Sequence, residues 1–345
     1  MPARNLECRK LEFDSMMNFS SSSPAWLAPF RIDPKFDVRV WGYQDLRPWF
    51  DVQATDGPIG EAWLTGDMCL VATGAHKGKR LDELFRAEHE ALLGPGVRET
   101  DSPLLVKLIF AKEKLSVQVH PDDAMAQKYG DARGKTECWY ALAADPGAQV
   151  AVGLKPGVSV RQVEKGIHEG TLEESLNILP VAKGDMIFVD AGTVHAIWPG
   201  AVLLETQQNC DLTYRMYDYG RPRELHIEKA MEATRLTTQA GKVAPKQLAD
   251  RAMLIDAGYF RMEKMEIERE RTGADLHPPG AAPGLAYLFV SRGAGMIRGE
   301  GFETFQLPAR GISAIPSSAP EFVLENASGD GSALEIVRIT PQWPV

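Results

Sequence analysis

Short apolar segments separated by turn-forming residues constrain the fold of this chain most. From Trp26 onward, segments such as PKFDVRVWGY and PIGEAWLTGD are bounded by glycine, proline and aspartate. The stretch 104–123 contains two such segments, and its LSVQVH part alternates apolar and polar side chains. Many short strands at this spacing are typical of sandwiches and closed barrels of the jelly-roll kind. The sequence therefore predicts a mainly β fold.

Three patches with helical periodicity interrupt the strand-like segments. Apolar residues recur at helical spacing in LDELFRAEHEALLG (81–94), which ends at a glycine. The stretch 158–179 reads as two short helices broken near Gly170, and 221–235 as a third helix with Pro222 in its first turn. We expect these patches to be helical insertions in a β framework.

The length and the linker-like composition near residue 240 predict two domains. A chain of 345 residues accommodates two domains of ordinary size. The division falls in TTQAGKVAPKQ, so we predict a first domain over 26–240 and a second over 246–345. Residues 1–25 show no periodicity and end in a serine run, and we predict that they form a flexible N-terminal arm.

Composition excludes several classes of protein. Hydrophobic residues make up 44% and charged residues 25%, so a disordered chain is excluded. A net charge of -9 without a long basic run argues against a nucleic-acid partner. The four cysteines show no CxxC spacing, and no apolar run approaches the roughly 20 residues that span a bilayer. We expect a cytoplasmic protein with no membrane or nucleic-acid partner. A phosphorylated small substrate is not excluded, because it needs only a few local cations.

Two histidines, a glutamate and a glutamine form a pattern suited to a metal ion. Gln118 and His120 are two residues apart in a predicted strand, so their side chains point to the same face, and Glu137 begins another apolar strand. The segment from Gly184 to His195 reads as a strand, a tight turn and a returning strand that begins with the histidine. Two imidazoles, a carboxylate and an amide oxygen suit zinc or a similar divalent ion used as a Lewis acid.

These segments resemble the cupin superfamily, and within it the short bacterial form of the type I phosphomannose (mannose-6-phosphate) isomerases. Gly184 through His195 resembles the second cupin motif, with Asp190 where proline is usual. QVH followed by Glu137 resembles the first motif, with glutamine where most cupins have histidine. Five ordered segments carry the resemblance over roughly residues 26–235: PLLVKLI, KLSVQVHPDD, GKTECWY, GDMIFVDAGTVHAI and LLETQQNCDLTYRMYDYGR. Gly134 stands where longer members have a histidine.

The resemblance implies a fold and a set of site residues. The fold would be a cupin (jelly-roll) barrel with helical insertions. In the C-terminal part, Ala309–Val323 reads as strand, turn and strand with Glu321 where a histidine would fall, which predicts a second cupin barrel without metal. One zinc ion per chain would be held by Gln118, His120, Glu137 and His195. Arg215 matches the catalytic arginine of the family and Glu205 an active-site carboxylate. The residues that match the lining of the sugar-phosphate pocket are Lys107, Ser116, Lys135 and Asp211.

The chemistry of aldose–ketose isomerisation explains these residue types. Interconversion of mannose 6-phosphate and fructose 6-phosphate moves a proton between C1 and C2 through an enediol(ate). A metal stabilises the developing negative oxygen, and a carboxylate within hydrogen-bond reach carries the proton. Glu205 and Asp211 are both candidates for that carboxylate. Arg215, Lys135 and Lys107 can neutralise phosphate or enediolate charge.

Two other functions stay open at the level of sequence, as does the oligomeric state. The first is a sugar-phosphate-binding or regulatory cupin without turnover, which would bind ligand but need not keep the proton-transfer residues. The second is an iron-dependent cupin oxygenase, disfavoured by the glutamine ligand and the cationic pocket. An assay with mannose 6-phosphate and a metal analysis discriminate among the three.

Overall fold

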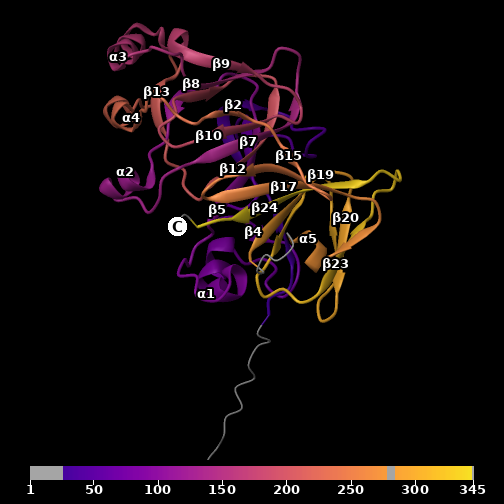
Figure 1. Cartoon of the computed structure of the whole chain (residues 1–345). Helices are drawn as coiled ribbons and strands as arrows, with labels where there is room; N and C mark the ends of the chain where they lie inside the picture. The colour runs from indigo at the N-terminus through magenta and orange to yellow at the C-terminus, as the bar shows by residue number, and fades with distance from the viewer. Residues whose placement is uncertain (1–25, 278–283, 344–345) are drawn as a thin grey trace, which may run out of the picture.

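The computed structural model describes residues 26–277 and 284–343, and it confirms the prediction of a mainly β protein. Over these residues the strands form four antiparallel sheets (Figure 1). The predicted N-terminal arm, residues 1–25, lies outside the described residues. None of the described helices is long and apolar enough to cross a membrane.

The two sheets that carry the candidate site residues are built from strands between Lys35 and Val243. The seven-stranded sheet has the order β14 (Gly241–Val243), β10 (Met186–Val189), β7 (Glu137–Ala144), β12 (Ala201–Gln208), β5 (Leu104–Phe110), β3 (Ile59–Trp63) and β2 (Lys35–Tyr43). The five-stranded sheet has the order β13 (Tyr214–Tyr217), β6 (Val117–Val119), β11 (His195–Ile197), β8 (Gln149–Leu154) and β9 (Leu176–Pro180).

The other two sheets are built mainly from the last third. The eight-stranded sheet has the order β15 (Lys246–Gln247), β16 (Ala252–Asp256), β17 (Phe260–Ile267), β24 (Leu334–Pro341), β19 (Ala286–Arg292), β22 (Ile312–Ile315), β1 (Phe30–Asp33) and β4 (Leu70–Val71). The four-stranded sheet has the order β18 (Glu270–Thr272), β23 (Phe322–Asn326), β20 (Gly295–Gly299) and β21 (Phe305–Leu307).

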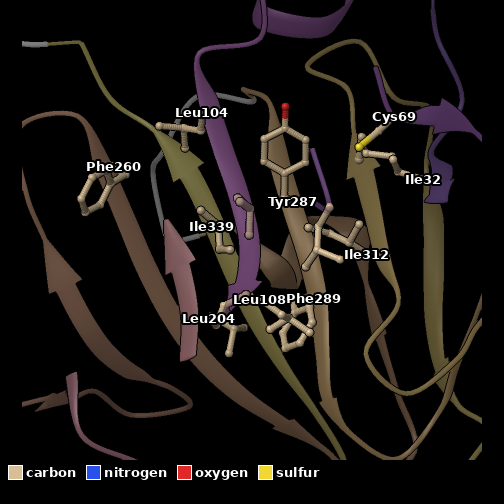
Figure 2. Close-up of a cluster of buried hydrophobic side chains, with 14 of the residues drawn as sticks. Ile32, Cys69, Leu104, Leu108, Leu204, Phe260, Tyr287, Phe289, Ile312 and Ile339 are labelled. Atoms are coloured by element: carbon tan, nitrogen blue, oxygen red, sulfur yellow. The ribbon is translucent and has the colours of Figure 1, made fainter. Parts of the chain in front are cut away.

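The buried clusters show how these sheets are layered. One cluster lies between the five- and seven-stranded sheets, and another between the eight- and four-stranded sheets. The largest cluster joins the outer faces of the seven- and eight-stranded sheets. Figure 2 labels side chains of this shared core: Leu104, Leu108 and Leu204 come from the seven-stranded sheet, and Phe260, Tyr287, Phe289, Ile312 and Ile339 come from the eight-stranded sheet. The two β layers of each half therefore enclose a core of their own, and the halves meet along a third.

The helices agree only in part with the sequence-based expectation. The helix expected over 81–94 is α1 (Leu81–Leu93), and that expected near 158–170 is α3 (Val160–Glu169), which ends at Gly170 in the left-handed conformation. The second helix expected before residue 179 is only a turn of 3-10 helix, η1 (Leu172–Ser175), because the chain then enters β9. The remaining helices are α2 (Asp123–Lys128), α4 (Ile227–Ala233) and α5 (Gly273–Leu276).

Two N-terminal strands join the sheet made by the end of the chain. In β1, Phe30 pairs with Ala314 of β22, and β4 pairs with the other side of β1. Residues on both sides of the predicted division near 240–246 thus share one sheet. The division into 26–240 and 246–345 stays a prediction. Separation of the two parts would have to break the pairing of β1 with β22.

Candidate active site

A cavity of about 470 Å³ opens between the five- and seven-stranded sheets. It is of the size that binds small molecules. Every site residue predicted from the sequence lines it except the two histidines, which lie buried behind it. The lining that was predicted comprises Lys107, Ser116, Gln118, Lys135, Glu137, Glu205, Asp211 and Arg215.

Strand register aligns three of these side chains on the five-stranded sheet. His195 of β11 is paired directly with Gln118 of β6, and Gln118 is paired on its other side with Arg215 of β13. Directly paired residues in an antiparallel sheet point to the same face. The flanking residues Val117 and Val119 point the other way, into the core beneath α3 and α4. His195, Gln118 and Arg215 therefore form one polar row facing the cavity.

A second row faces it from the seven-stranded sheet. Glu205 of β12 is paired with Lys107 of β5 on one side and with Trp139 of β7 on the other. Neighbouring residues such as Leu204 and Cys138 point into the core shared by the two halves of the molecule. Because strand side chains alternate between faces, every second residue of these buried strands faces the cavity, and Lys107 and Glu205 are among these residues.

His120, Glu137 and His195 converge at the inner end of the cavity. Their potential ligand atoms all lie within 4.8 Å of one another, and all three side chains are buried. Glu137 Oε2 lies 3.5 Å from His120 Nε2, and Glu137 Oε1 lies 3.5 Å from His195 Nε2. The carboxylate of Glu137, from the seven-stranded sheet, thus bridges two imidazoles carried by neighbouring strands of the five-stranded sheet, one on β11 and one directly after β6. Such a cluster is a candidate metal site.

The hydrogen bonds of the two imidazoles place the proton on Nδ1 and the lone pair on Nε2 in each ring. His120 Nδ1 lies 2.7 Å from the Leu212 carbonyl oxygen, and His195 Nδ1 lies 2.9 Å from that of Thr193. A carbonyl oxygen only accepts, so both Nδ1 atoms carry the proton and both Nε2 atoms carry a lone pair. Burial lowers the pKa of His195 to about 4 and, together with the Lys135 charge, lowers the pKa of His120 well below its usual value. Both rings are neutral at pH 7, as metal ligands must be.

The same ligand atoms already hold a cationic group, the Lys135 ammonium. Lys135 Nζ donates to Glu137 Oε2 at 2.5 Å and lies 3.0 Å from His120 Nε2. Burial works against this charge, but Glu137 and Glu205 outweigh it and raise the pKa of Lys135. Among the described side chains that are buried around the cavity, three are carboxylates (Glu61, Glu137, Glu205) and two are ammonium groups (Lys107, Lys135). The donor atoms and the excess of carboxylates both fit a divalent cation.

Gln118 is oriented by Ser116 beside this cluster. Ser116 Oγ donates to Gln118 Oε1 at 3.1 Å, and Gln118 Nε2 lies 3.3 Å from His195 Nε2. In this arrangement the amide nitrogen, a donor, faces the imidazole lone pair. Exchange of the amide oxygen and nitrogen by rotation about the last side-chain bond would turn an oxygen ligand toward the cluster.

A chain of alternating charges runs from the His120–Glu137–His195 cluster to the mouth of the cavity. Lys135 Nζ lies 3.6 Å from Glu205 Oε1, which lies 3.1 Å from Lys107 Nζ. Lys107 Nζ lies 3.6 Å from Glu61 Oε1, and Arg39 Nη2 donates to Glu61 Oε2 at 2.8 Å. Glu205 Oε2 also accepts from Trp139 Nε1 at 3.1 Å. Each buried charge therefore has an opposite charge on both sides, which offsets its loss of hydration.

Glu61 and Arg39 were not identified from the sequence. Burial opposes the charge of Glu61, but Lys107, Arg39 and the Trp63 N–H outweigh it and hold the pKa of Glu61 at about 2. Glu61 lies on β3, in IGEAW, where a glutamate stands two residues before a tryptophan in an otherwise apolar strand. A charge inside a buried strand was the available signal. Register pairs Glu61 with Ile109 rather than with Lys107, and only the folded structure shows that its carboxylate reaches Lys107 Nζ at 3.6 Å.

Arg215 and Asp211 lie toward the mouth of the cavity rather than in its buried end. Arg215 is half-buried, and its Nη1 donates to the Glu224 carbonyl oxygen at 2.7 Å. Its Nε is buried and has no hydrogen-bond acceptor in the part of the chain that the structure describes. Asp211 is exposed. Arg223, which was also not identified from the sequence, lines the same side of the mouth.

Comparison with known proteins agrees with this site. Residues 30–151 match the family model of the catalytic domain of type I phosphomannose isomerase. A mannose-6-phosphate isomerase of Streptococcus mutans is 35% identical over 253 residues, which are 69% of this chain and 79% of that protein. The chain belongs to the mannose-6-phosphate isomerase family.

The fold of this family member matches solved structures over most of its length. The crystal structure of the Bacillus subtilis mannose 6-phosphate isomerase is 31% identical and has a TM-score of 0.78, with 90% of this chain and 99% of the other covered. A mannose 6-phosphate isomerase solved with zinc and yttrium bound shares the fold at 15% identity, with a TM-score of 0.70 over 92% of this chain and all of the other. The matches extend well past residue 151, so both halves of the molecule belong to the shared fold.

Proposed function

We propose that this protein is a zinc-dependent aldose–ketose isomerase that interconverts mannose 6-phosphate and fructose 6-phosphate. The observation that supports it most directly is the convergence of two neutral imidazoles and a carboxylate beside a lysine–glutamate chain in one cavity. Membership of the mannose-6-phosphate isomerase family supplies the substrate pair. The metal assignment and the substrate assignment can be tested separately, because the first rests on the residue cluster and the second on the family.

We assign Gln118, His120, Glu137 and His195 as the ligands of one zinc ion per chain. A zinc ion held by these residues would act as a Lewis acid toward the oxygens of the substrate. Thr193 and Leu212 supply the carbonyl oxygens that fix the two imidazoles. Such outer contacts set ring orientation and therefore ligand geometry. The ammonium of Lys135 would remain next to the ligands as a proton donor and as a positive charge.

Glu205 is the better placed of the two candidate bases. It lies inside the cavity, whereas Asp211 lies in the solvent-exposed mouth. Its Oε1 contacts Lys107 at 3.1 Å, but outside hydrogen-bond geometry, and accepts no hydrogen bond from a described residue. An oxygen with a free acceptor direction can take the proton that leaves C2 or C1. Trp139 holds the other oxygen and so fixes the direction in which the free one points.

Three cations can then stabilise the negative charge of the reacting sugar. Lys135 and Lys107 flank Glu205, and Arg215 is fixed by strand pairing beside Gln118. Burial keeps water away from Lys107 and Lys135, which strengthens their action on an enediolate oxygen. Glu61 and Glu205 outweigh burial and raise the pKa of Lys107, so its charge persists through the neutral range.

Removal of the metal tests the proposal. The purified protein is assayed for conversion of mannose 6-phosphate to fructose 6-phosphate, before and after treatment with a chelator. We expect turnover to be lost with the chelator and restored by zinc, because the Lewis acid is removed and returned. Turnover that resists complete removal of metal would contradict the zinc assignment.

A binding measurement and a metal analysis on the same preparation separate the two alternative functions from the isomerase. Binding of mannose 6-phosphate by the zinc-loaded protein without any conversion would support a binding or regulatory cupin. A preparation that contains stoichiometric iron and little zinc would support an oxygenase. The buried Glu205 and Lys107 argue against both, since neither binding nor oxygen chemistry needs a carboxylate positioned between two ammonium groups.

A further inference from the structure

A tyrosine hydroxyl from the half of the molecule built mainly from the last third of the chain, here called the second half, reaches the segments that carry the candidate metal ligands. Tyr259 lies in the turn between β16 and β17, and its Oη donates to Asp123 Oδ2 at 2.7 Å. Asp123 comes three residues after His120 in the chain. Tyr259 does not line the cavity, so its effect on the site has to pass through the residues that it contacts.

Asp123 connects this hydroxyl to the segment that carries the ligand glutamate. Its Oδ1 accepts from the backbone N–H of Gly134 at 2.7 Å and from Gln208 Nε2 at 2.9 Å. Gln208 Oε1 in turn accepts from the backbone N–H of Thr136 at 2.9 Å, and the Gln208 N–H donates to the Thr136 carbonyl oxygen at 3.2 Å. Thr136 directly precedes Glu137. A continuous path of hydrogen bonds therefore connects the second half to the neighbour of a candidate metal ligand.

The backbone of Tyr259 is fixed to the second half. Phe260, the next residue, is fully buried in the core shared by the two halves and pairs with Pro341 of β24. The Tyr259 carbonyl oxygen accepts from the backbone N–H of Gln342 at 2.8 Å, and the Tyr259 ring packs against the shared core. A hydroxyl carried by so restrained a residue limits the positions that the Asp123 carboxylate can take.

The contact between Tyr259 and Asp123 is a charge-assisted hydrogen bond. Burial opposes the charge of Asp123, but the three donors that its carboxylate accepts from outweigh burial and lower the pKa of Asp123. Burial and the Asp123 carboxylate raise the pKa of Tyr259 to about 12. Tyr259 therefore keeps its proton, and Asp123 its charge, throughout the neutral range. Hydrogen bonds of this kind are stronger than those between neutral groups.

We propose that Tyr259 is a positioning residue for the metal ligands, through which the second half of the molecule contributes to zinc binding and turnover. This inference rests on the proposed function, and it deepens it. Contacts behind the ligands of a metal set their orientation and so the affinity of the site. Tyr259 restrains Asp123, and Asp123 restrains the segments that carry His120 and Glu137. The second half thereby acts on the site without supplying a residue to the cavity lining.

The test compares Tyr259→Phe with Tyr287→Phe in the zinc-loaded enzyme. Tyr287 is the matched control, because its hydroxyl also joins the two halves but lies 3.2 Å from Ser102 Oγ rather than on Asp123. Each variant loses one hydroxyl and keeps its ring. We expect Tyr259→Phe to weaken zinc binding by about 3- to 10-fold, less than loss of a direct partner of a ligand, because Tyr259 acts through Asp123. Tyr287→Phe should change zinc affinity by less than about 2-fold, since Ser102 is not part of this path.

Zinc affinity is measured by competition with a chromophoric chelator, a readout that does not depend on turnover. Steady-state kinetics with mannose 6-phosphate at saturating zinc provide the second readout. We expect kcat of Tyr259→Phe to fall by about 3- to 10-fold while KM stays within about 3-fold of wild type, because Lys135 and Glu137 shift and the mouth of the cavity does not. The control variant Tyr287→Phe should keep the kcat of the wild type.

A double-mutant cycle shows whether Tyr259 acts through Asp123. In the Asp123→Ala background, Tyr259→Phe should cause no further loss of zinc affinity, because the hydroxyl has no carboxylate left to hold. An equal loss in both backgrounds, or equal zinc affinities of Tyr259→Phe and Tyr287→Phe, would overturn the inference. If Tyr259→Phe does not fold, as judged by circular dichroism, Asp123→Asn takes its place in the comparison, and wild-type zinc affinity in that variant overturns the inference.

Failure of the proposed function looks different. A wild-type protein that neither binds zinc nor converts mannose 6-phosphate would contradict the function itself. A wild-type enzyme that is active and zinc-dependent while Tyr259→Phe behaves like Tyr287→Phe would contradict only the positioning role.

Discussion

At the scale of single residues, burial distinguishes two carboxylates that the sequence alone leaves as equal candidates for the base. Glu205 and Asp211 are both carboxylates near the DLTYR segment, and both were candidates for the base. The structure buries Glu205 between Lys107 and Trp139 and leaves Asp211 in solvent. A general base must reach the carbon-bound proton, so position decides between them before acidity does.

The comparison of Glu205→Gln with Asp211→Asn tests this choice. We expect Glu205→Gln to lower kcat by about 10²- to 10⁴-fold, the range for loss of a general base. Asp211→Asn should lower it by less than about 5-fold, because an exposed charge contributes little. Both variants should keep their zinc, which metal analysis checks, since neither residue is an assigned ligand. The reverse order of the two effects would transfer the role to Asp211.

At the scale of elements, a single carboxylate joins the segments that carry the candidate metal ligands His120 and Glu137. Asp123, the first residue of α2, accepts from the backbone N–H of Gly134 at 2.7 Å and from Gln208 Nε2 at 2.9 Å. Its other oxygen accepts from Tyr259 Oη at 2.7 Å, a contact from the eight-stranded half of the molecule. Lys135 completes this junction, because its N–H donates to the Pro121 carbonyl oxygen at 3.0 Å. The segments that bear His120 and Glu137 are thereby held at a fixed separation.

Gly134 is required at this junction by space rather than by backbone conformation. A Cβ atom there would lie 2.4 Å from the Asp122 carbonyl carbon and 2.5 Å from the Pro121 carbonyl oxygen. These are backbone atoms that cannot move independently. The absence of a larger side chain at this position thus follows from the close approach of the two segments.

The variant Gly134→Ala measures the importance of this approach. We expect it to reduce the free energy of unfolding by about 1–3 kcal/mol, as other overpacked sites do, and to lower kcat because Lys135 and Glu137 shift. Gly258→Ala is the control, since a Cβ there meets no atom within 4 Å. Denaturant unfolding and steady-state kinetics check both variants. A Gly134→Ala protein as stable and active as the control would show that the segments are free to separate.

At the scale of the whole molecule, the largest core belongs to neither half alone. It lies between the seven- and eight-stranded sheets, and β1 and β4 extend the eight-stranded sheet with strands from the start of the described chain. Alternation assigns each strand's side chains to one core or the other: Phe289 of β19 points into the shared core, and Leu288 points into the second half. Such a shared core couples the stability of the two halves.

Phe289→Ala tests this coupling. We expect the substitution to cost about 3–5 kcal/mol, the usual value for a fully buried phenylalanine. Unfolding should remain one transition, with loss of activity and loss of tertiary circular dichroism at the same temperature, because both halves bury side chains against Phe289. Two separate transitions in calorimetry would show that the halves fold independently, with the half that contains Phe289 unfolding at the lower temperature.

Much of the fold could be predicted from local pattern. The β character, α1, α3 and the strand–turn–strand segment ending at His195 all follow from turn residues and hydrophobic period, which act over a few neighbours. The helix expected over 221–235 begins only at Ile227, because the preceding residues turn back onto β13 through the His226–Arg215 hydrogen bonds. The expected second helix after Gly170 gives way to β9, which pairs with β8. Both differences arise where contacts with a distant strand outweigh local helical pattern.

The sequence by itself determined which residue types are present for the chemistry: two histidines, a glutamate and a glutamine at strand spacing, with the lysines and carboxylates of the family motifs. Only the tertiary structure decided which of them meet. The register of β11, β6 and β13 aligns His195, Gln118 and Arg215, and the approach of a second sheet brings Lys107 and Glu205 opposite them. Register and sheet packing depend on hydrogen bonds and apolar contacts between residues far apart in the chain. For that reason Glu61 and Arg223, which have no local motif, emerge as part of the site only in the folded protein.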